Sequence, residues 1–393
     1  MLFSWLLLNL ITILFLFYSY GFVDLNLTLT SNHFFLHLIS FLQHLVYFQR
    51  PLSASIYLSL LIGLHLLALL IWWLGRSRFK WSWFWLLPSL ILALAYPFLS
   101  HDIFNYLFYA KELLFYHQNP HLIPPNHFPH DTWLRFMRWV HVPSPYGYLH
   151  TFLVLPSYLL SFGKFTLALF NLKIFNWFAY LTTAFALNRL SLNLKFSPSK
   201  RRLVQLSFLF QPLILIEFLI NAHNDAWMMA FFLWSLVFFL EDRRFLTLLF
   251  FVAAGSIKYI TFLSLPFFLL FRFSSFFKLR FSSYQLISWI CSSLLIGVVL
   301  FWWLFKFQIW YLLWFFTLLP LFLTSFLDFL FSLIYSFYAL SYYYFFILTG
   351  FWSREPQYYR LGLFSLTFIF LIILNRSTFK SFFLWYNRNH HDR

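Results

Sequence analysis

Long runs of apolar residues, each about 15 to 20 residues in length, recur along the chain between short polar breaks. An α-helix needs about 20 apolar residues to cross the hydrocarbon core of a bilayer, whereas the strands of a membrane barrel alternate apolar and polar residues. Charged residues make up 10% of the chain and hydrophobic residues 62%, which excludes a soluble globular protein. The sequence therefore predicts an all-α polytopic membrane protein.

The polar breaks delimit the expected membrane-spanning helices. They are expected over 2–18, 56–74, 82–99, 165–187, 203–220, 226–240, 285–305, 308–325, 329–349 and 361–375. The stretch 245–271 is apolar except at Gly255, Ser256 and Lys258. It is either one long helix or two short helices that meet at Lys258.

Basic residues decide between these alternatives, because short loops rich in Lys and Arg stay in the cytoplasm. Most of the 27 Lys and Arg residues fall into five clusters, which are Arg76/Arg78/Lys80, Arg189/Lys195/Lys200/Arg201/Arg202, Arg243/Arg244, Arg272/Lys278/Arg280 and Arg376/Lys380/Arg388/Arg393. If all five are cytoplasmic, the stretch 245–271 crosses twice with Lys258 at the outer tip. This topology has about 12 crossings, places both termini in the cytoplasm and leaves residues 100–164 outside as one long connection.

The net charge of +16 does not indicate a nucleic-acid partner, because the basic residues are scattered over short loops and form no basic face. The lipid bilayer is the expected partner instead. Cys291 is the only cysteine, so an internal disulfide and a cysteine-based metal site are excluded. No positively charged region precedes residues 2–18, and we expect them to be retained as the first helix.

The outer connection holds the first candidates for chemistry. A helix that begins at Asp102 is expected to lie in the outer interface, with one apolar face and one polar face. The polar face would carry Asp102, Asn105, Tyr106 and Tyr109. Asp102 is either a helix N-cap or a general base, and both roles are compatible because a helix N-terminus keeps a carboxylate ionised.

Further along this connection, a second interfacial helix is expected within 148–162, which is too short to cross comfortably. Arg135 and Arg138 lie three residues apart, and on one helical face they would contact either lipid headgroups or a phosphate.

A second polar cluster, residues 221–225, follows the expected 203–220 helix at its outer end, with Glu217 one turn deeper. Ionisable groups among apolar helices are costly and usually face a partner or a cavity. The alternative is a tight outer turn in which Asp225 caps the next helix. Lys258 either snorkels to the headgroups or binds the phosphate of a lipid substrate. Asp102, His223, Asp225 and Lys258 all map to the outer face, which favours one shared site.

The order of these motifs resembles the first outer loop of the GT-C superfamily of membrane glycosyltransferases, and in particular bacterial polyprenyl-phosphate-mannose-dependent mannosyltransferases. The resemblance covers residues 82–275. The matching segments are Ser100-His101-Asp102-Ile103-Phe104-Asn105-Tyr106, Tyr109-Ala110-Lys111-Glu112, Asn119-Pro120, Pro145-Tyr146-Gly147-Tyr148, His223-Asn224-Asp225-Ala226, Lys258-Tyr259 and Leu265-Pro266.

The resemblance implies the GT-C fold and a catalytic role for Asp102. As the base, Asp102 would deprotonate an acceptor hydroxyl, which then attacks the anomeric carbon of a lipid-phosphate hexose with inversion. The implied donor is a polyprenyl-phosphate sugar, with mannose as the expected hexose. The acceptor is a glycan, a lipid or a protein on the outer face of the plasma membrane. The expected substrate-binding residues are His101, Asn105, Tyr106, Arg135, Arg138, Tyr146, His223, Asn224, Asp225 and Lys258.

No cofactor is expected to be required. Many members of the superfamily carry two adjacent acids where this chain has His101 and Asp102, so the resemblance leaves a metal open. A divalent cation held by His101, Asp102, His223 and Asp225 is possible, although no spacing among them requires one.

The expected organisation has three parts. Residues 1–81 form two N-terminal membrane helices, 82–275 the catalytic membrane core, and 276–393 the C-terminal helices and a basic cytoplasmic tail. One alternative function is a secondary transporter or lipid flippase that uses Glu217, Asp225 and Lys258 as coupling charges. Another is a membrane scaffold whose long outer loop binds a partner.

Overall fold

The structure is a computed structural model that describes residues 1–23, 31–79, 82–274, 276, 281–305, 308–352 and 357–390, without the side chains of 83, 357–358 and 376–390. All regular elements within these ranges are helices. The expected domain boundaries after residues 81 and 275 fall outside the described residues. So do Lys80, Lys278, Arg280 and Arg393, and the side chains of Arg376, Lys380 and Arg388 are not described.

Several helices are long and apolar enough to cross a membrane. They are α1 (Leu2–Tyr20), α3 (Arg50–Arg78), α13 (Ser283–Leu304) and the segment Phe326–Thr349, which comprises α15 (Phe326–Leu340) and α16 (Tyr342–Thr349). A fifth candidate is α8 (Pro198–Leu209) together with Pro212–Ile220, a pair bent by 44°. The chain is therefore a helical membrane protein, but the expected count of about 12 crossings is not confirmed.

Three of the expected helices are interrupted. The 203–220 helix breaks at Gln211, because Pro212 has no N–H to continue the hydrogen-bond ladder. Beyond the break, α9 (Pro212–Ile214) leads into a π-helical segment, η4 (Leu215–Ile220).

The other two are fragmented in a similar way. The expected 82–99 helix consists of η1 (Trp83–Leu86) and α4 (Leu87–Ala93), after which the chain is irregular up to His101. The expected 308–325 helix is divided into η6 (Ile309–Leu312), α14 (Leu313–Phe316) and η7 (Leu319–Leu321). In addition, α2 (His33–Leu45) forms where no helix was expected.

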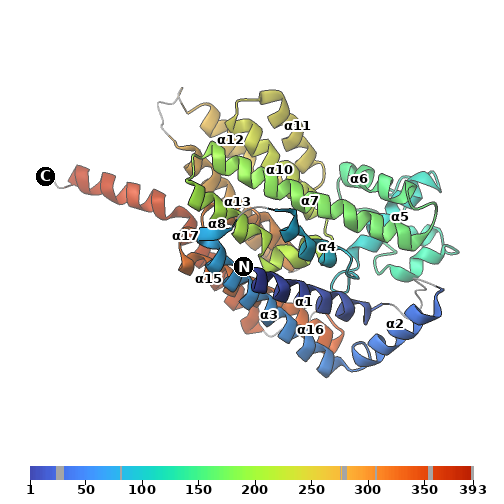
Figure 1. Cartoon of the computed structure of the whole chain (residues 1–393). Coiled ribbons are helices and arrows are strands. Elements are labelled where there is room, and N and C mark those ends of the chain that lie inside the picture. Colours follow the sequence, from blue (N-terminus) through green and yellow to red (C-terminus); the bar gives the residue numbers. More distant parts are fainter. Residues whose placement is uncertain are drawn as a thin grey trace.

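The outer connection folds over one end of the helical body. Here α5 (Asp102–Leu114) packs against α6 (Tyr148–Leu159) and against α7 (Phe165–Asn193), with the short elements η2 (Pro125–His127) and η3 (Thr132–Phe136) in the loop between α5 and α6. Figure 1 shows α5 and α6 side by side at the right-hand end of α7. The expected two-faced helix is wrong for α5, since every residue from Ile103 to Ala110 is at most 2% exposed. The loop and α6 bury its polar face as well as its apolar one.

The stretch after α10 (Asp225–Leu240) consists of two legs. α11 (Arg244–Gly255) ends at a turn over Ser256–Lys258, and η5 (Tyr259–Ser264) and α12 (Leu265–Arg272) follow it. α11 packs against α10 and against η5, so the chain doubles back at Lys258. The chain ends with α17 (Gln357–His390), which packs against α13 and α15.

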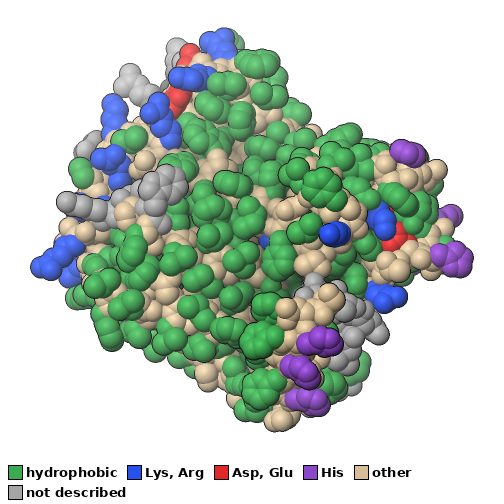
Figure 2. Space-filling view, turned by 45° about the vertical axis from the view of Figure 1, so that its right-hand side comes forward, with side chains coloured by type: hydrophobic (Ala, Val, Ile, Leu, Met, Phe, Trp, Pro, Cys, Tyr) green, Lys and Arg blue, Asp and Glu red, His purple; other side chains and the backbone are tan. Residues whose placement is uncertain are grey.

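Charged and apolar surfaces are separated on the outside of the molecule. Figure 2 shows most of the visible Lys and Arg side chains gathered at the upper left, and the exposed His side chains at the opposite, right-hand and lower edges. A broad hydrophobic surface lies between them. Such a surface suits a chain that is surrounded by lipid.

Candidate active site

A buried ion pair forms between the start of α10 and the turn after α11. Lys258 Nζ donates to Asp225 Oδ2 at 2.6 Å, and Trp314 Nε1 donates to Asp225 Oδ1 at 2.6 Å. The side chain of Asp225 is 0% exposed and that of Lys258 is 16% exposed. Asp225 is the first residue of α10 but binds these two side chains, so its carboxylate does not serve as the cap of that helix.

Asp102 lies beside this pair at the start of α5. Its Oδ2 accepts a hydrogen bond of 3.3 Å from the hydroxyl of Tyr146 and lies 3.8 Å from Nδ1 of His223. The N-cap position of α5 belongs to His101. Burial raises the pKa of the Asp102 carboxyl, while His223, Lys258 and Tyr146 oppose this rise. The Asp102 carboxylate therefore contacts Tyr146 and His223, and Asp102 does not occupy the N-cap position.

His223 connects Asp102 to a deeper carboxylate. Its Nε2 lies 3.3 Å from Oε2 of Glu217, and its ring stacks on Trp310 with the centroids 4.2 Å apart. Tyr343 and Asn221 both donate hydrogen bonds of 2.8 Å to Glu217, which hold that carboxylate in place. These contacts fix the orientation of the imidazole between the two acids.

A left-handed residue makes this cluster possible. Ala222 has a φ of 54°, a conformation that is costly for a residue with a Cβ. The reversal follows the π-helical segment, and His223 and Asp225, two residues apart, contact Asp102 and Lys258 respectively. Strain of this kind is concentrated at functional sites.

Gly147 holds the segment that carries Tyr146 next to the turn that carries Lys258. Its N–H donates to the carbonyl oxygen of Ile257 at 3.0 Å. A Cβ at this position would lie 1.9 Å from the carbonyl oxygen of Ser256, so no larger residue fits without separating the two segments. This close approach joins the Pro-rich end of the outer loop to the Lys258 turn.

Asp102, Tyr146 and Lys258 face a cavity of about 580 Å³, a size typical of small-ligand sites. His223 and Asp225 are fully buried and are not among its lining residues. Asp102, Asn105, Tyr146 and Lys258 contribute polar groups to its lining. Aromatic side chains make up much of the remainder, and they are Tyr109, Trp139, Tyr259, Phe301, Phe305, Trp310, Tyr311 and Trp314. The polar groups converge at one wall of a largely aromatic cavity, an arrangement that suits a sugar ring.

Asn105, Tyr106 and Asn224 differ in their positions relative to the cavity. Asn105 lines it and also donates to the carbonyl oxygen of Trp139 at 3.0 Å, which holds the loop. Tyr106 is buried behind Tyr146, with the two rings edge to face at 5.1 Å. Asn224 is fully buried and is not among the lining residues.

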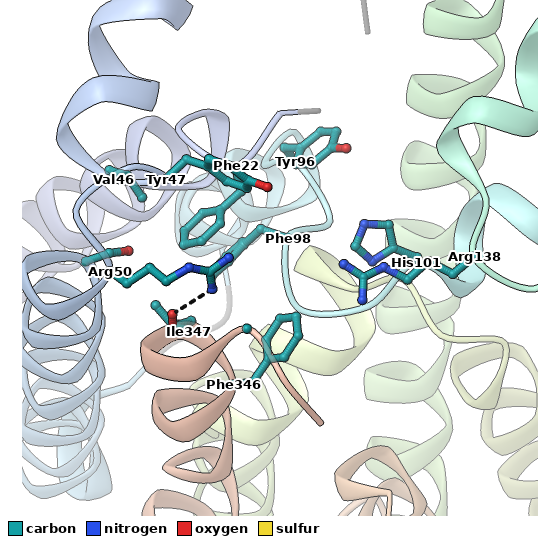
Figure 3. Close-up of a pocket in the computed structure, with 12 residues that line it drawn as sticks. Phe22, Val46, Tyr47, Arg50, Tyr96, Phe98, His101, Arg138, Phe346 and Ile347 are labelled. Carbon is teal, nitrogen blue, oxygen red and sulfur yellow. Dashed lines mark hydrogen bonds between the residues drawn. The ribbon is translucent and has the colours of Figure 1, made fainter. Parts of the chain in front are cut away.

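His101 and Arg138 belong to a second cavity of about 270 Å³, and Figure 3 shows both pointing into it. Burial and the neighbouring Arg138 lower the pKa of His101 to about 3. Arg135 lies in η3, which ends at Phe136, and it lines neither cavity. The expected shared helical face of Arg135 and Arg138 is therefore wrong, because the chain is extended at Met137.

Sequence reasoning missed the aromatic residues of η6 and α14. Trp310, Tyr311 and Trp314 lie beyond the last recognised motif, yet all three line the cavity, and Trp314 donates to Asp225. The available signal was a segment with three large aromatic residues in five positions and no charge. Arg50, which lines the second cavity, was missed for a similar reason, since an arginine at the start of an apolar helix is usually an interfacial anchor.

Within the ranges that the structure describes, no group of three or more His, Cys, Asp and Glu side chains could hold a metal ion. The four residues considered as ligands do not face one common cavity, and His223 and Asp225 line neither of the two. His101 lines the smaller cavity, whereas Asp102 lines the larger one.

The fold and the site together define a helical membrane protein with an acid-lined, aromatic cavity at the end of its helices. A family model described as alpha-(1->6)-mannopyranosyltransferase, N-terminal domain, matches residues 28–274, more than half of the chain. The chain belongs to this family of GT-C type mannosyltransferases and is a membrane glycosyltransferase. No curated protein and no solved structure matches it.

Proposed function

We propose that this protein transfers mannose from a polyprenyl-phosphate donor to an acceptor hydroxyl at the outer face of the membrane, with Asp102 as the general base and with inversion at the anomeric carbon. The observation that carries the proposal is the position of the Asp102 carboxylate. It lines the 580 Å³ cavity within reach of Tyr146 and His223. Family membership supports mannose, and it favours an enzyme over the transporter and the scaffold.

The proposed step has a simple balance. An acceptor hydroxyl gives its proton to Asp102 as its oxygen forms a bond to the anomeric carbon. The bond between that carbon and the phosphate oxygen breaks, and the electron pair leaves with the lipid phosphate. General-base catalysis of this kind contributes about 10² to 10⁴-fold to the rate. A raised pKa brings the Asp102 carboxylate closer to the basicity that the transfer requires.

The surroundings of the site support a lipid-linked donor and the outer face. A donor that stays in the bilayer must reach a site at the ends of the helices, and the cavity wall is largely aromatic. Most of the visible Lys and Arg side chains gather at the upper left, away from the exposed His side chains (Figure 2), and the positive-inside rule favours the cytoplasm for that end. In this orientation both termini are cytoplasmic and the enzyme acts from the plasma membrane.

We further propose that the reaction requires no metal ion. The charge of Asp225 is neutralised by Lys258, and the Asp102 carboxylate lies 3.8 Å from Nδ1 of His223. Dialysis against a chelator should leave transfer unchanged. Loss of activity that returns with a divalent cation would contradict this part of the proposal.

The test is sugar transfer in membranes that contain the wild type or Asp102→Asn. Radiolabelled polyprenyl-phosphate-mannose and polyprenyl-phosphate-glucose serve as donors, and labelled products are measured. We expect mannose transfer that falls by about 10² to 10⁴-fold in Asp102→Asn. The matched control is Asp242→Asn, whose side chain is 72% exposed, and it should transfer at the wild-type rate. Full transfer by Asp102→Asn at a normal protein level would disprove the assignment of the base.

A further inference from the structure

The smaller cavity contains an unusual concentration of positive charge. Arg50 enters it from the start of α3, and Arg138 enters it from the opposite side together with His101 (Figure 3). Phe98 and Phe346 lie between the two arginines in this view, and Arg138 lies 6.0 Å from the Phe346 ring. The cavity thus combines two guanidinium groups with an aromatic wall.

No acidic residue is among the side chains that line this cavity, and no ion pair of Arg50 or Arg138 occurs in the described part of the chain. Arg50 donates one hydrogen bond of 3.3 Å to the carbonyl oxygen of Ile347, which leaves further N–H groups for a ligand. The N-terminus of α3, a helix of 29 residues, adds the positive end of its dipole at the same point. The cavity is therefore built for an anion.

Lys258 is different in this respect. Its ammonium group is 2.6 Å from a fully buried carboxylate, so its charge is already neutralised within the protein. A phosphate that replaced Asp225 as its partner would leave that carboxylate buried without compensation, which is strongly unfavourable. The arginine pair is the better phosphate ligand, because it has the matching charge and the geometry for two-point hydrogen bonding.

The two cavities meet at one dipeptide. His101 lines the smaller cavity and Asp102, the next residue, lines the larger one. Consecutive Cα atoms are about 3.8 Å apart, so a group bound on one side lies close to the base on the other. An inverting displacement needs the acceptor and the leaving phosphate on opposite sides of the anomeric carbon, and two cavities lined by adjacent residues offer separate places for them.

We propose that Arg50 and Arg138, with His101 beside them, bind the phosphate of the prenyl-phosphate donor and of the lipid phosphate that leaves. This inference rests on the proposed function and replaces Lys258 as the phosphate ligand. The larger cavity then receives the acceptor.

The charge of the two arginines matches the product better than the donor. The donor is a phosphodiester with one negative charge. When the bond to the anomeric carbon breaks, the electron pair stays on the phosphate oxygen. The released lipid monophosphate then carries up to two negative charges. Two guanidinium groups gain interaction energy as this charge develops, so they stabilise the transition state more than the bound donor.

The experiment measures binding of tritiated farnesyl phosphate to the full chain in nanodiscs, without acceptor. We expect Arg50→Gln and Arg138→Gln each to weaken binding by about 10-fold to 100-fold, the range for a charged hydrogen-bonding partner. Arg50→Lys, which keeps the charge, should recover part of the loss. Farnesol, which lacks the phosphate, should bind at least about 10-fold more weakly to the wild type. Arg244→Gln, at an arginine outside both cavities, should bind as the wild type does.

The outcomes separate the rival explanations. Wild-type binding in both arginine variants, or a loss confined to Lys258→Gln, would overturn the proposal. Equal affinity for dioleoylphosphatidic acid, or equally strong competition by inorganic phosphate, would make the cavity a general phosphate site and would overturn the donor assignment. Thermal unfolding of each variant identifies losses caused by misfolding, and Arg50→Lys and Arg138→Gln provide two independent variants for that comparison.

The binding assay needs no turnover, so it fails independently of the proposed function. If arginine-dependent binding occurs while the wild type transfers no sugar, the proposed reaction is wrong and the phosphate site stands. If transfer depends on Asp102 but not on Arg50 or Arg138, the reaction stands and the phosphate site is wrong.

Discussion

Lys258 and Asp225 form a hydrogen-bonded ion pair of 2.6 Å across a distance of 33 residues in the chain. The carboxylate lies at the first position of α10 and the ammonium group at the turn after α11. Trp314 donates to the second carboxylate oxygen from a third element, α14. The pair therefore holds together three parts of the chain at the wall of the larger cavity.

Replacement of either Lys258 or Asp225 alone should lower the stability of the fold more than replacement of both together. Asp225→Asn or Lys258→Met leaves one charge buried without its partner, and we expect each to lose about 3 to 5 kcal/mol of stability. The double variant should be more stable than either single variant. Thermal unfolding in detergent ranks the stabilities of the two single variants and the double variant. Single variants as stable as the wild type would show that the pair has no structural role.

The pH dependence of transfer should report Asp102. A base must be ionised to accept a proton, so transfer should fall as the pH drops through its pKa, which burial raises. Tyr146→Phe removes an O–H donor to the ionised form, so the pKa should rise further and the acid limb of kcat/KM should move to higher pH. Tyr148→Phe, two residues away and 55% exposed, is the control and should leave the profile in place. An acid limb that does not move in Tyr146→Phe would argue against Asp102 as the titrating group.

Gly147→Ala should disrupt the contact between the outer loop and the Lys258 turn. Its Cβ would lie 1.9 Å from a backbone oxygen, and relief of such a clash typically costs about 1 to 3 kcal/mol. Because the loop carries Tyr146, we expect transfer to fall by more than the loss of folded protein explains. The comparison is Gly163→Ala, where a Cβ meets nothing within 4 Å and the penalty comes from the positive φ alone. This variant should lose about 1 kcal/mol and keep its specific activity. Equal specific activities in the two variants would contradict the role of Gly147.

Trp314→Phe should show that the C-terminal helices complete the site. The change removes the Nε1 donor to Asp225 and keeps an aromatic ring, so we expect a loss of about 1.5 to 3 kcal/mol in stability together with reduced transfer. Trp303→Phe, at a side chain that is 80% exposed, should change neither. Thermal unfolding and sugar transfer are measured on the same preparations of the two variants and compared with the wild type. Wild-type values in Trp314→Phe would confine the site to the segment that the family model matches.

Much of the candidate site could be expected from the sequence. A topology based on basic loops maps Asp102, His223, Asp225 and Lys258 to one face. In the structure Asp102 lies 3.8 Å from His223 and Asp225 lies 2.6 Å from Lys258, but only Asp102 and Lys258 line the larger cavity. The expected helix starting at Asp102 also forms. Its buried polar face could not be foreseen, because the covering loop has no periodic pattern.

Other features depend on packing between distant segments. His101 and Arg138 were expected at the same site as Asp102, but the turn before α5 directs His101 into the smaller cavity, which Arg50 also lines. Trp310 and Trp314 reach the larger cavity because the expected 308–325 helix is broken into short pieces. Sequence patterns reveal local periodicity. Neither the position of His101 nor that of Trp310 and Trp314 leaves such a pattern in the nearby sequence.

The sequence by itself determined the class of this protein. Apolar runs of helical length and scarce charge leave membrane helices as the solution that satisfies the backbone in lipid, and the order of the polar motifs indicates the glycosyltransferase family. The tertiary structure decided which charges are compensated and which face a cavity. Lys258 is neutralised by a residue 33 positions away, whereas Arg50 and Arg138, 88 positions apart, line one cavity that has no acidic residue among its described lining. Electrostatic compensation depends on distance in space, and only the packed helices fix that distance.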